Sequence, residues 1–152
     1  MTEPITFAST TPRFDLPLLF QGQAQKEFFV NESFMLVDAL LHATVKGVTS
    51  APPAVPAPGD CWLVGADPSG AWAGKTNCLA SFTGSTWVFA APRGGMRAFD
   101  LALDQYRTFA GSWNAPVTPA APQGGATIDA EARNALNQLI AALRSAGILA
   151  PA

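Results

Sequence analysis

Phe82-Thr83-Gly84-Ser85-Thr86-Trp87 decides the fold, because the chain repeats it in a shorter form as Phe109-Ala110-Gly111-Ser112-Trp113. Each copy sets an aromatic residue, a Gly-Ser turn and a tryptophan in order, which is the pattern of a short β-hairpin with a tight tip. Ser69-Gly70-Ala71-Trp72 is a weaker third copy. The repeat therefore predicts a small β-module of hairpins with aromatic rings beside its turns.

The residues around these hairpins have the composition of short strands. We expect strands over residues 60–64, 78–82, 87–90, 96–103 and 106–109. In the fourth of these, Phe99, Leu101 and Leu103 alternate with Asp100 and Asp104, which places the apolar side chains inward and the carboxylates in water. The module is expected to be a half-solvated antiparallel sheet.

An arm and a long helix are expected before the β-module. Pro12 and Pro17 favour an extended path for residues 1–22. From about residue 23 to 45, apolar residues recur at helical spacing and cover most of the circumference, so this helix needs more than one partner. His42 falls within the segment and is expected in a core or an interface.

A second helix is expected from residue 127 to 146. Thr127 is a suitable N-cap, and Glu131 and Arg144 match the helix dipole at the two ends. The apolar residues step by four and three positions, and a helix of this length is marginal alone in water. It is therefore expected to dock on its own domain or on copies of itself.

These elements predict an α+β protein with five regions, which we expect to assemble as an elongated trimer. They are an N-terminal arm and assembly helix (1–50), a Pro-rich linker (51–59), an antiparallel β-module (60–114), a Pro/Gly linker (115–126) and a C-terminal oligomerisation or docking helix (127–152).

The composition excludes several classes of partner. Only 13% of the 152 residues are charged and 49% are hydrophobic, so we expect other subunits to cover part of the surface. A net charge of −2 with nine scattered basic residues gives no stripe for nucleic acid. No stretch approaches the roughly 20 apolar residues that span a bilayer, so membrane insertion is not expected.

The cellular context follows from the first residues and the cysteines. Met1-Thr2-Glu3-Pro4 lacks the basic and apolar segments of a secretory signal, so we expect synthesis in a bacterial cytoplasm without a signal peptide. Cys61 and Cys78 are not in CxxC spacing, and free thiols are the expected state.

Residues for catalysis or metal binding do not form a recognisable pattern. There is one histidine, no GxSxG sequence, and the eleven acidic residues are dispersed. Metal binding needs a cluster of ligands, and glycoside hydrolysis needs two facing carboxylates. We therefore expect a protein that is not an enzyme and has no metal or cofactor.

The aromatic residues beside turns are the candidates for binding. Flat rings near Ser, Asn and Arg can stack on sugar faces, although each ring is explained as well by packing in a small β-module. The candidate carbohydrate-binding residues are Trp72, Trp87, Arg97, Tyr106 and Trp113. The candidate oligomerisation residues, on the two helices, are Phe28, Met35, Leu36, Leu40, Ile128, Ala132, Ala135, Leu139 and Leu143.

The run from Thr11 to Glu27, TPRFDLPLLFQGQAQKE, together with Asn31-Glu32 and Leu36–Leu40, resembles an uncharacterised family. Its members are tail-fibre or head-spike proteins of alphaproteobacterial prophages and gene transfer agents. The resemblance continues through Pro92-Arg93-Gly94-Gly95 and covers roughly residues 11–113. It implies a virion component, trimeric, that contacts other spike, fibre or capsid proteins and a host surface polysaccharide.

Three functions are weighed on these grounds. The first is a non-enzymatic spike or fibre subunit that attaches a phage-like particle to host polysaccharide. The second is a purely structural adaptor that links a spike or fibre to the particle. The third is a polysaccharide depolymerase, for which the sequence offers no persuasive pair of acids.

Overall fold

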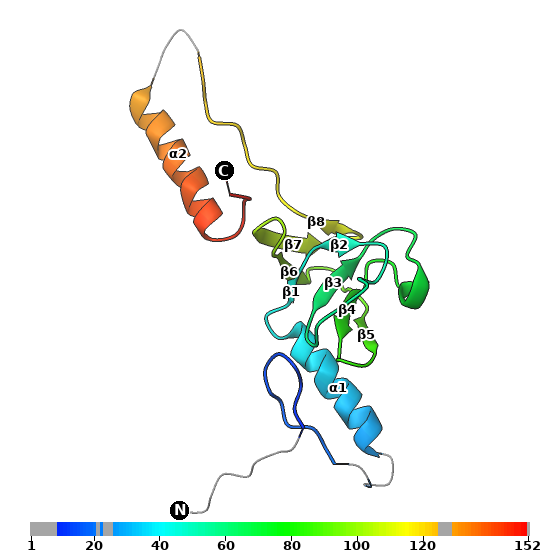
Figure 1. Ribbon diagram of the computed structural model, residues 1–152. Helices are drawn as coiled ribbons and strands as arrows, with labels where there is room; N and C mark the ends of the chain where they lie inside the picture. Colours follow the sequence, from blue (N-terminus) through cyan, green and yellow to red (C-terminus); the bar gives the residue numbers. More distant parts are fainter. Residues whose placement is uncertain (1–8, 21, 23–25, 125–128, 152) are drawn as a thin grey trace, which may run out of the picture. The chain divides into compact units, whose positions relative to one another are not determined.

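The computed structural model describes residues 9–20, 22, 26–124 and 129–151 of the chain (Figure 1). Within these residues the fold is α+β, as expected, with two α-helices and two small four-stranded sheets. The chain divides into two compact units, Met1–Pro92 and Arg93–Ala152. The division falls inside the range 60–114 that the sequence indicates as one β-module.

The first unit contains one helix and one complete sheet. Its elements are α1 (Lys26–Leu40), β1 (Thr44–Val45), β2 (Val48–Thr49), β3 (Cys61–Val64), the 3-10 helix η1 (Gly70–Trp72), β4 (Leu79–Phe82) and β5 (Trp87–Ala90). The sheet has the strand order β2-β3-β4-β5, and β3, β4 and β5 form an antiparallel meander.

The strand pairs within residues 60–114 are antiparallel, as expected, and β2, which precedes this range, pairs with β3 in the parallel direction. The Leu63 amide donates to the Gly47 carbonyl at 3.0 Å, and the Gly65 amide donates to the Thr49 carbonyl at 2.8 Å. A parallel pair needs a crossover connection, and the Pro-rich residues 51–59 lie within it. This segment connects two paired strands inside the first unit.

The two repeated hairpins are confirmed. Phe82 pairs with Trp87 across the β4–β5 turn, and in the second unit Phe109 pairs with Trp113. The turn glycines, Gly84 and Gly111, have φ values of +103° and +84°, which residues with a Cβ rarely adopt. The third copy is not a hairpin: Gly70–Trp72 is η1, and its Trp72 side chain enters the core.

The core of the first unit is built around tryptophan. Val64, Trp72 and Ala80 are buried together, and the partly buried Trp87 packs edge-on against Trp72 with ring centroids 5.0 Å apart. Trp62, Cys78 and Phe89 also pack against this cluster. Large rings compensate here for short strands, because each buries more area than an aliphatic side chain.

Helix α1 ends at Leu40, earlier than the expected residue 45. The Arg13 guanidinium accounts for this end, because it donates to the carbonyls of Asp38 and Ala39 at 2.9 Å and to that of His42 at 3.2 Å. These are the carbonyl groups that a helix leaves without partners at its C-terminus. His42 lies beyond the helix with a φ of +47° and is exposed, so of its two expected places the core is wrong, and the interface stays a prediction.

Within the described part of the arm, residues 10–17 form a tight loop rather than an extended path, and residues 1–8 lie outside the described residues. The Thr11 amide donates to the Leu16 carbonyl at 2.9 Å, and Thr10 and Pro17 form an antiparallel bridge. The buried carboxylate of Asp38 accepts from the Thr11 hydroxyl at 2.7 Å and from the Phe14 amide at 2.8 Å. The loop is therefore fastened to the end of α1.

The second unit contains β6 (Arg97–Asp100), β7 (Gln105–Phe109), β8 (Trp113–Asn114) and α2 (Ala130–Ser145). β6, β7 and β8 form an antiparallel meander. Asp100 is buried and lies 2.6 Å from Arg107, whereas Leu101 is 56% exposed. The expected sides of Asp100 and Leu101 are therefore wrong, because the strand ends at Asp100 and the arginine compensates the buried carboxylate, whereas Asp104 is exposed as expected.

Helix α2 begins with Asp129 as its N-cap, whose carboxylate accepts from the Ala132 amide at 2.9 Å. The expected cap Thr127 and the candidate Ile128 lie outside the described residues. No residue of α2 is buried. Past its end, the Gly147 carbonyl accepts from the Tyr106 amide at 2.7 Å, and Leu149 is buried, so the C-terminal segment packs on the sheet.

Candidate ligand-binding groove

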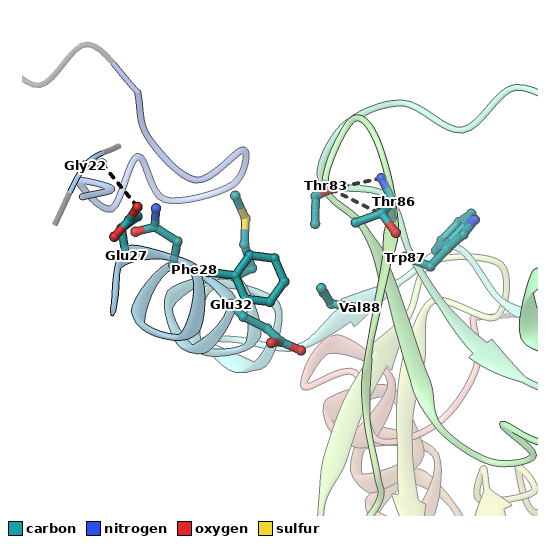
Figure 2. Close-up of a pocket in the computed structure, with 10 residues that line it drawn as sticks. Gly22, Glu27, Phe28, Glu32, Thr83, Thr86, Trp87 and Val88 are labelled. Carbon is teal, nitrogen blue, oxygen red and sulfur yellow. Dashed lines mark hydrogen bonds between the residues drawn. The ribbon is translucent and has the colours of Figure 1, made fainter. Parts of the chain in front are cut away.

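The first unit has a groove of about 740 Å³ between α1 and the β4–β5 hairpin (Figure 2). Helix α1 packs against β5, which fixes the two walls relative to each other. The lining residues are Gly22, Glu27, Phe28, Asn31, Glu32, Met35, Thr83, Thr86, Trp87 and Val88. The groove is therefore made by α1 and by the hairpin that the repeated sequence encodes.

The apolar part of the groove is centred on Phe28. Its ring is 68% exposed and projects from α1 toward Val88 of the hairpin (Figure 2). Met35 continues the apolar wall along the helix. An aromatic ring held open to solvent beside a groove is available for stacking on a ligand.

Trp87 supports the groove from behind. Its ring lies on the far side of the hairpin from α1 (Figure 2), edge-on to Trp72 and 5.1 Å from the Phe82 ring. The expected sugar-stacking residue is thus at the groove, but its ring is held in packing contacts. Trp87 would therefore act on a ligand only indirectly, by fixing where Val88 and the hairpin tip lie.

Polar groups border the groove on both walls. At the hairpin tip, the Thr83 hydroxyl lies 3.2 Å from the Thr86 amide and 3.0 Å from the Thr86 carbonyl. On α1, the Asn31 side chain makes two hydrogen bonds with the Leu19 backbone, so it fixes the arm rather than a ligand. Glu32 is exposed one helical turn after Phe28 and leaves α1 on the same side (Figure 2).

The other candidate carbohydrate-binding residues do not form one site. Trp72 is completely buried, so its ring offers no surface to a ligand. In the second unit, Arg97 lies over the Tyr106 ring, 4.3 Å from its centroid, and shares a face of the sheet with it. Trp113 pairs with Phe109, and strand alternation places both on the opposite face.

A smaller hollow of about 310 Å³ lies in the second unit, where the end of α2 meets the sheet. Phe99 and Tyr106 form its apolar side. The Tyr106 ring is already engaged by Arg97 and by Phe99, whose ring centroid is 5.1 Å away. These contacts hold the Tyr106 ring in packing.

The sequence prediction missed most of the groove. Phe28 and Met35 were assigned to oligomerisation, and Glu32, Thr83, Thr86 and Val88 had no binding role. The i, i+4 spacing of Phe28 and Glu32 was available as a signal, since it puts an aromatic ring and a carboxylate side by side on a helix. Which strand faces that pair depends on tertiary packing, and the spacing does not reveal it.

The two cysteines are free thiols. Cys61 is buried opposite Ser81, and burial raises the pKa of its thiol above its usual value, partly offset by the hydrogen bond with Ser81. Burial also raises the pKa of Cys78, with Lys75 acting in the opposite direction. Raised pKa values keep both groups as thiols at neutral pH, which is the inert rather than the nucleophilic form.

The described part of the chain has neither a metal-ligand cluster nor a helix suited to span a membrane. It contains no group of three or more His, Cys, Asp or Glu residues placed to hold a metal ion. None of its helices combines the length and the apolar character that crossing a membrane requires.

The fold and the groove define a small α+β protein in which a helix and a β-hairpin border an open, partly aromatic groove. Residues 30–114 match the family DUF2793, described as a protein of unknown function. The match covers more than half of the chain, so the protein belongs to this family. No curated protein matches the chain.

Proposed function

We propose that this protein is a non-enzymatic spike or fibre subunit of a phage-like particle and that it attaches the particle to a host surface polysaccharide. The observation that carries the proposal is the groove between α1 and the β4–β5 hairpin. It combines an open aromatic ring, Phe28, with an adjacent carboxylate, Glu32, and with hydroxyl groups at the hairpin tip.

This combination suits the chemistry of a sugar. A pyranose ring has an apolar C–H face that packs on an aromatic ring, and its hydroxyl groups need hydrogen-bonding partners around that face. Glu32 is a strong acceptor for two hydroxyls, and Thr83 and Thr86 supply weaker groups on the opposite wall. One such site is weak, but copies in an assembled particle would bind a polymer jointly.

The resemblance of the arm and of α1 to phage-like attachment proteins supports the location on a particle. The exposed apolar side chains support assembly. Phe29, Val37 and Leu40 on α1, and Leu136 and Leu139 on α2, are each at least 40% exposed in a single chain and lie outside the groove lining. Monomeric proteins rarely leave so much apolar surface in water.

The test uses purified protein and two strains of a candidate host that differ only in their surface polysaccharide. We expect the protein to bind cells that carry the polysaccharide and to lose most binding on cells that lack it. Phe28→Ser should weaken binding, whereas Phe20→Ser should not, because Phe20 is also exposed but does not line the groove. Equal binding to both strains contradicts the proposal.

A second function, the structural adaptor, is favoured by α2, which has no buried residue in its own chain. An adaptor would bind another particle protein through this helix and would bind neither strain of cells. The depolymerase hypothesis is tested in the same experiment by measuring reducing ends in the medium, because an enzyme would release new ones from the polysaccharide.

A further inference from the structure

The charged residues that line the groove are all acidic. Glu27 and Glu32 lie on the α1 wall, and the described lining contains no lysine, arginine or histidine. Lys26 precedes Glu27 on α1 but is not part of the lining. Asp38 lies under the arm, bonded to Thr11 and Phe14. The negative potential of the groove therefore comes from its two glutamates.

The partial positive charge at the start of α1 does not make the potential of the groove positive. The first turn of a helix has a partial positive charge, and Glu27 is the acidic residue in that turn. The Glu27 carboxylate accepts from the Gly22 amide at 3.1 Å, so it is held at this end of the groove. Glu32, one turn further, is exposed beside the Phe28 ring and is the carboxylate that a stacked ligand would meet (Figure 2).

We infer that Glu32 makes the groove selective for uncharged glycans and discriminates against glycans that carry carboxylate or sulfate groups. This inference rests on the proposed function, because it names the class of polysaccharide that the same groove accepts. A hydroxyl donates to the Glu32 carboxylate, whereas a uronate in its place presents a second negative charge.

The size of the effect follows from the Coulomb energy at a water-exposed site. Two carboxylates about 6–8 Å apart repel each other enough to weaken binding about 3- to 10-fold at low salt. Because salt screens such charges, the discrimination should shrink as the ionic strength rises toward 1 M. A neutral glycan should show no such salt dependence.

The experiment compares matched pairs of glycans. Neutral glucan, galactan and mannan chains are each paired with the same chain oxidised at C6 to uronate, and dissociation constants are measured by calorimetry in low salt with EDTA. For the chain that binds, we expect the oxidised form to bind about 3- to 10-fold more weakly. Glu32→Gln should bring the ratio close to one, and Glu32→Lys should reverse it.

Glu131→Gln is the matched control, because Glu131 is exposed on α2 and does not line the groove. It removes the same charge and should leave the ratio unchanged. Equal affinity for the two forms, or a ratio that Glu32→Gln does not alter, overturns the inference about Glu32 but not the proposed function. Failure of every neutral and every oxidised chain to bind overturns both the inference and the proposed function.

Discussion

Asp38 links the N-terminal arm to the first helix. It is buried, and its carboxylate accepts hydrogen bonds from the Thr11 hydroxyl and from the amides of Arg13 and Phe14. The Arg13 side chain in turn binds the last carbonyls of α1. The sequence TPRFD is therefore used to close a helix, and because its partner lies about 25 residues away, local pattern alone could not predict this role.

Replacing Asp38 by Asn tests this linkage. The amide NH₂ would face donors of the arm, and leaving a buried donor without an acceptor costs about 1–3 kcal/mol. We expect Asp38→Asn to lower the free energy of unfolding by about that amount, measured by urea denaturation. Asp67→Asn is the control, since Asp67 is exposed and asparagine tolerates its φ of +48°. Equal stability of the two variants would contradict the role of Asp38.

The elements differ in how far the sequence predicts them. The β4–β5 and β7–β8 hairpins are predictable because each turn sets an aromatic pair across two strands, Phe82 with Trp87 and Phe109 with Trp113. The two-residue strands β1 and β2 are too short for any periodicity to appear. The alternation in β6 predicts that Asp100 faces water. The structure buries Asp100 because Arg107, on another strand, pairs with its carboxylate.

The turn after α2 depends on Gly147, which lies against the sheet of the second unit. Gly147 has a φ of +66°, and a Cβ there would lie 2.9 Å from the Phe99 ring. Gly147→Ala should therefore destabilise the second unit by about 1–3 kcal/mol, and hydrogen exchange at the Tyr106 amide should accelerate. Gly124→Ala has a similar φ but no heavy atom within 4 Å, so its effect should be smaller.

At the scale of the whole molecule, the exposed apolar side chains of the two helices are the residues that a trimer would cover. The structure describes one chain and leaves the trimer a prediction. The candidate oligomerisation residues Phe28, Leu40, Ala132, Ala135 and Leu139 are exposed, and Met35, Leu36 and Leu143 are partly so. The groove itself depends on packing between α1 and β5, which no pattern within either element encodes.

Leu139→Glu tests the assembly role of α2. Leu139 is 56% exposed on a helix that buries no side chain, and a charge at the centre of an apolar contact between helices is strongly unfavourable. We expect the wild-type protein to sediment as a trimer and Leu139→Glu to sediment as a monomer. Leu101→Glu, also at a 56% exposed leucine but in a turn, should still form trimers. A wild-type monomer would contradict the prediction.

The affinity of the groove for polysaccharide tests the central claim most directly. Phe28 is 68% exposed and lines the groove, whereas Phe20 is 51% exposed and does not line it. Titration of the wild-type protein, Phe28→Ser and Phe20→Ser with a surface polysaccharide should show binding that is about tenfold weaker for Phe28→Ser alone, the size expected for loss of one stacked ring. Equal affinities for all three proteins, or no binding by the wild type, would contradict a glycan-binding groove.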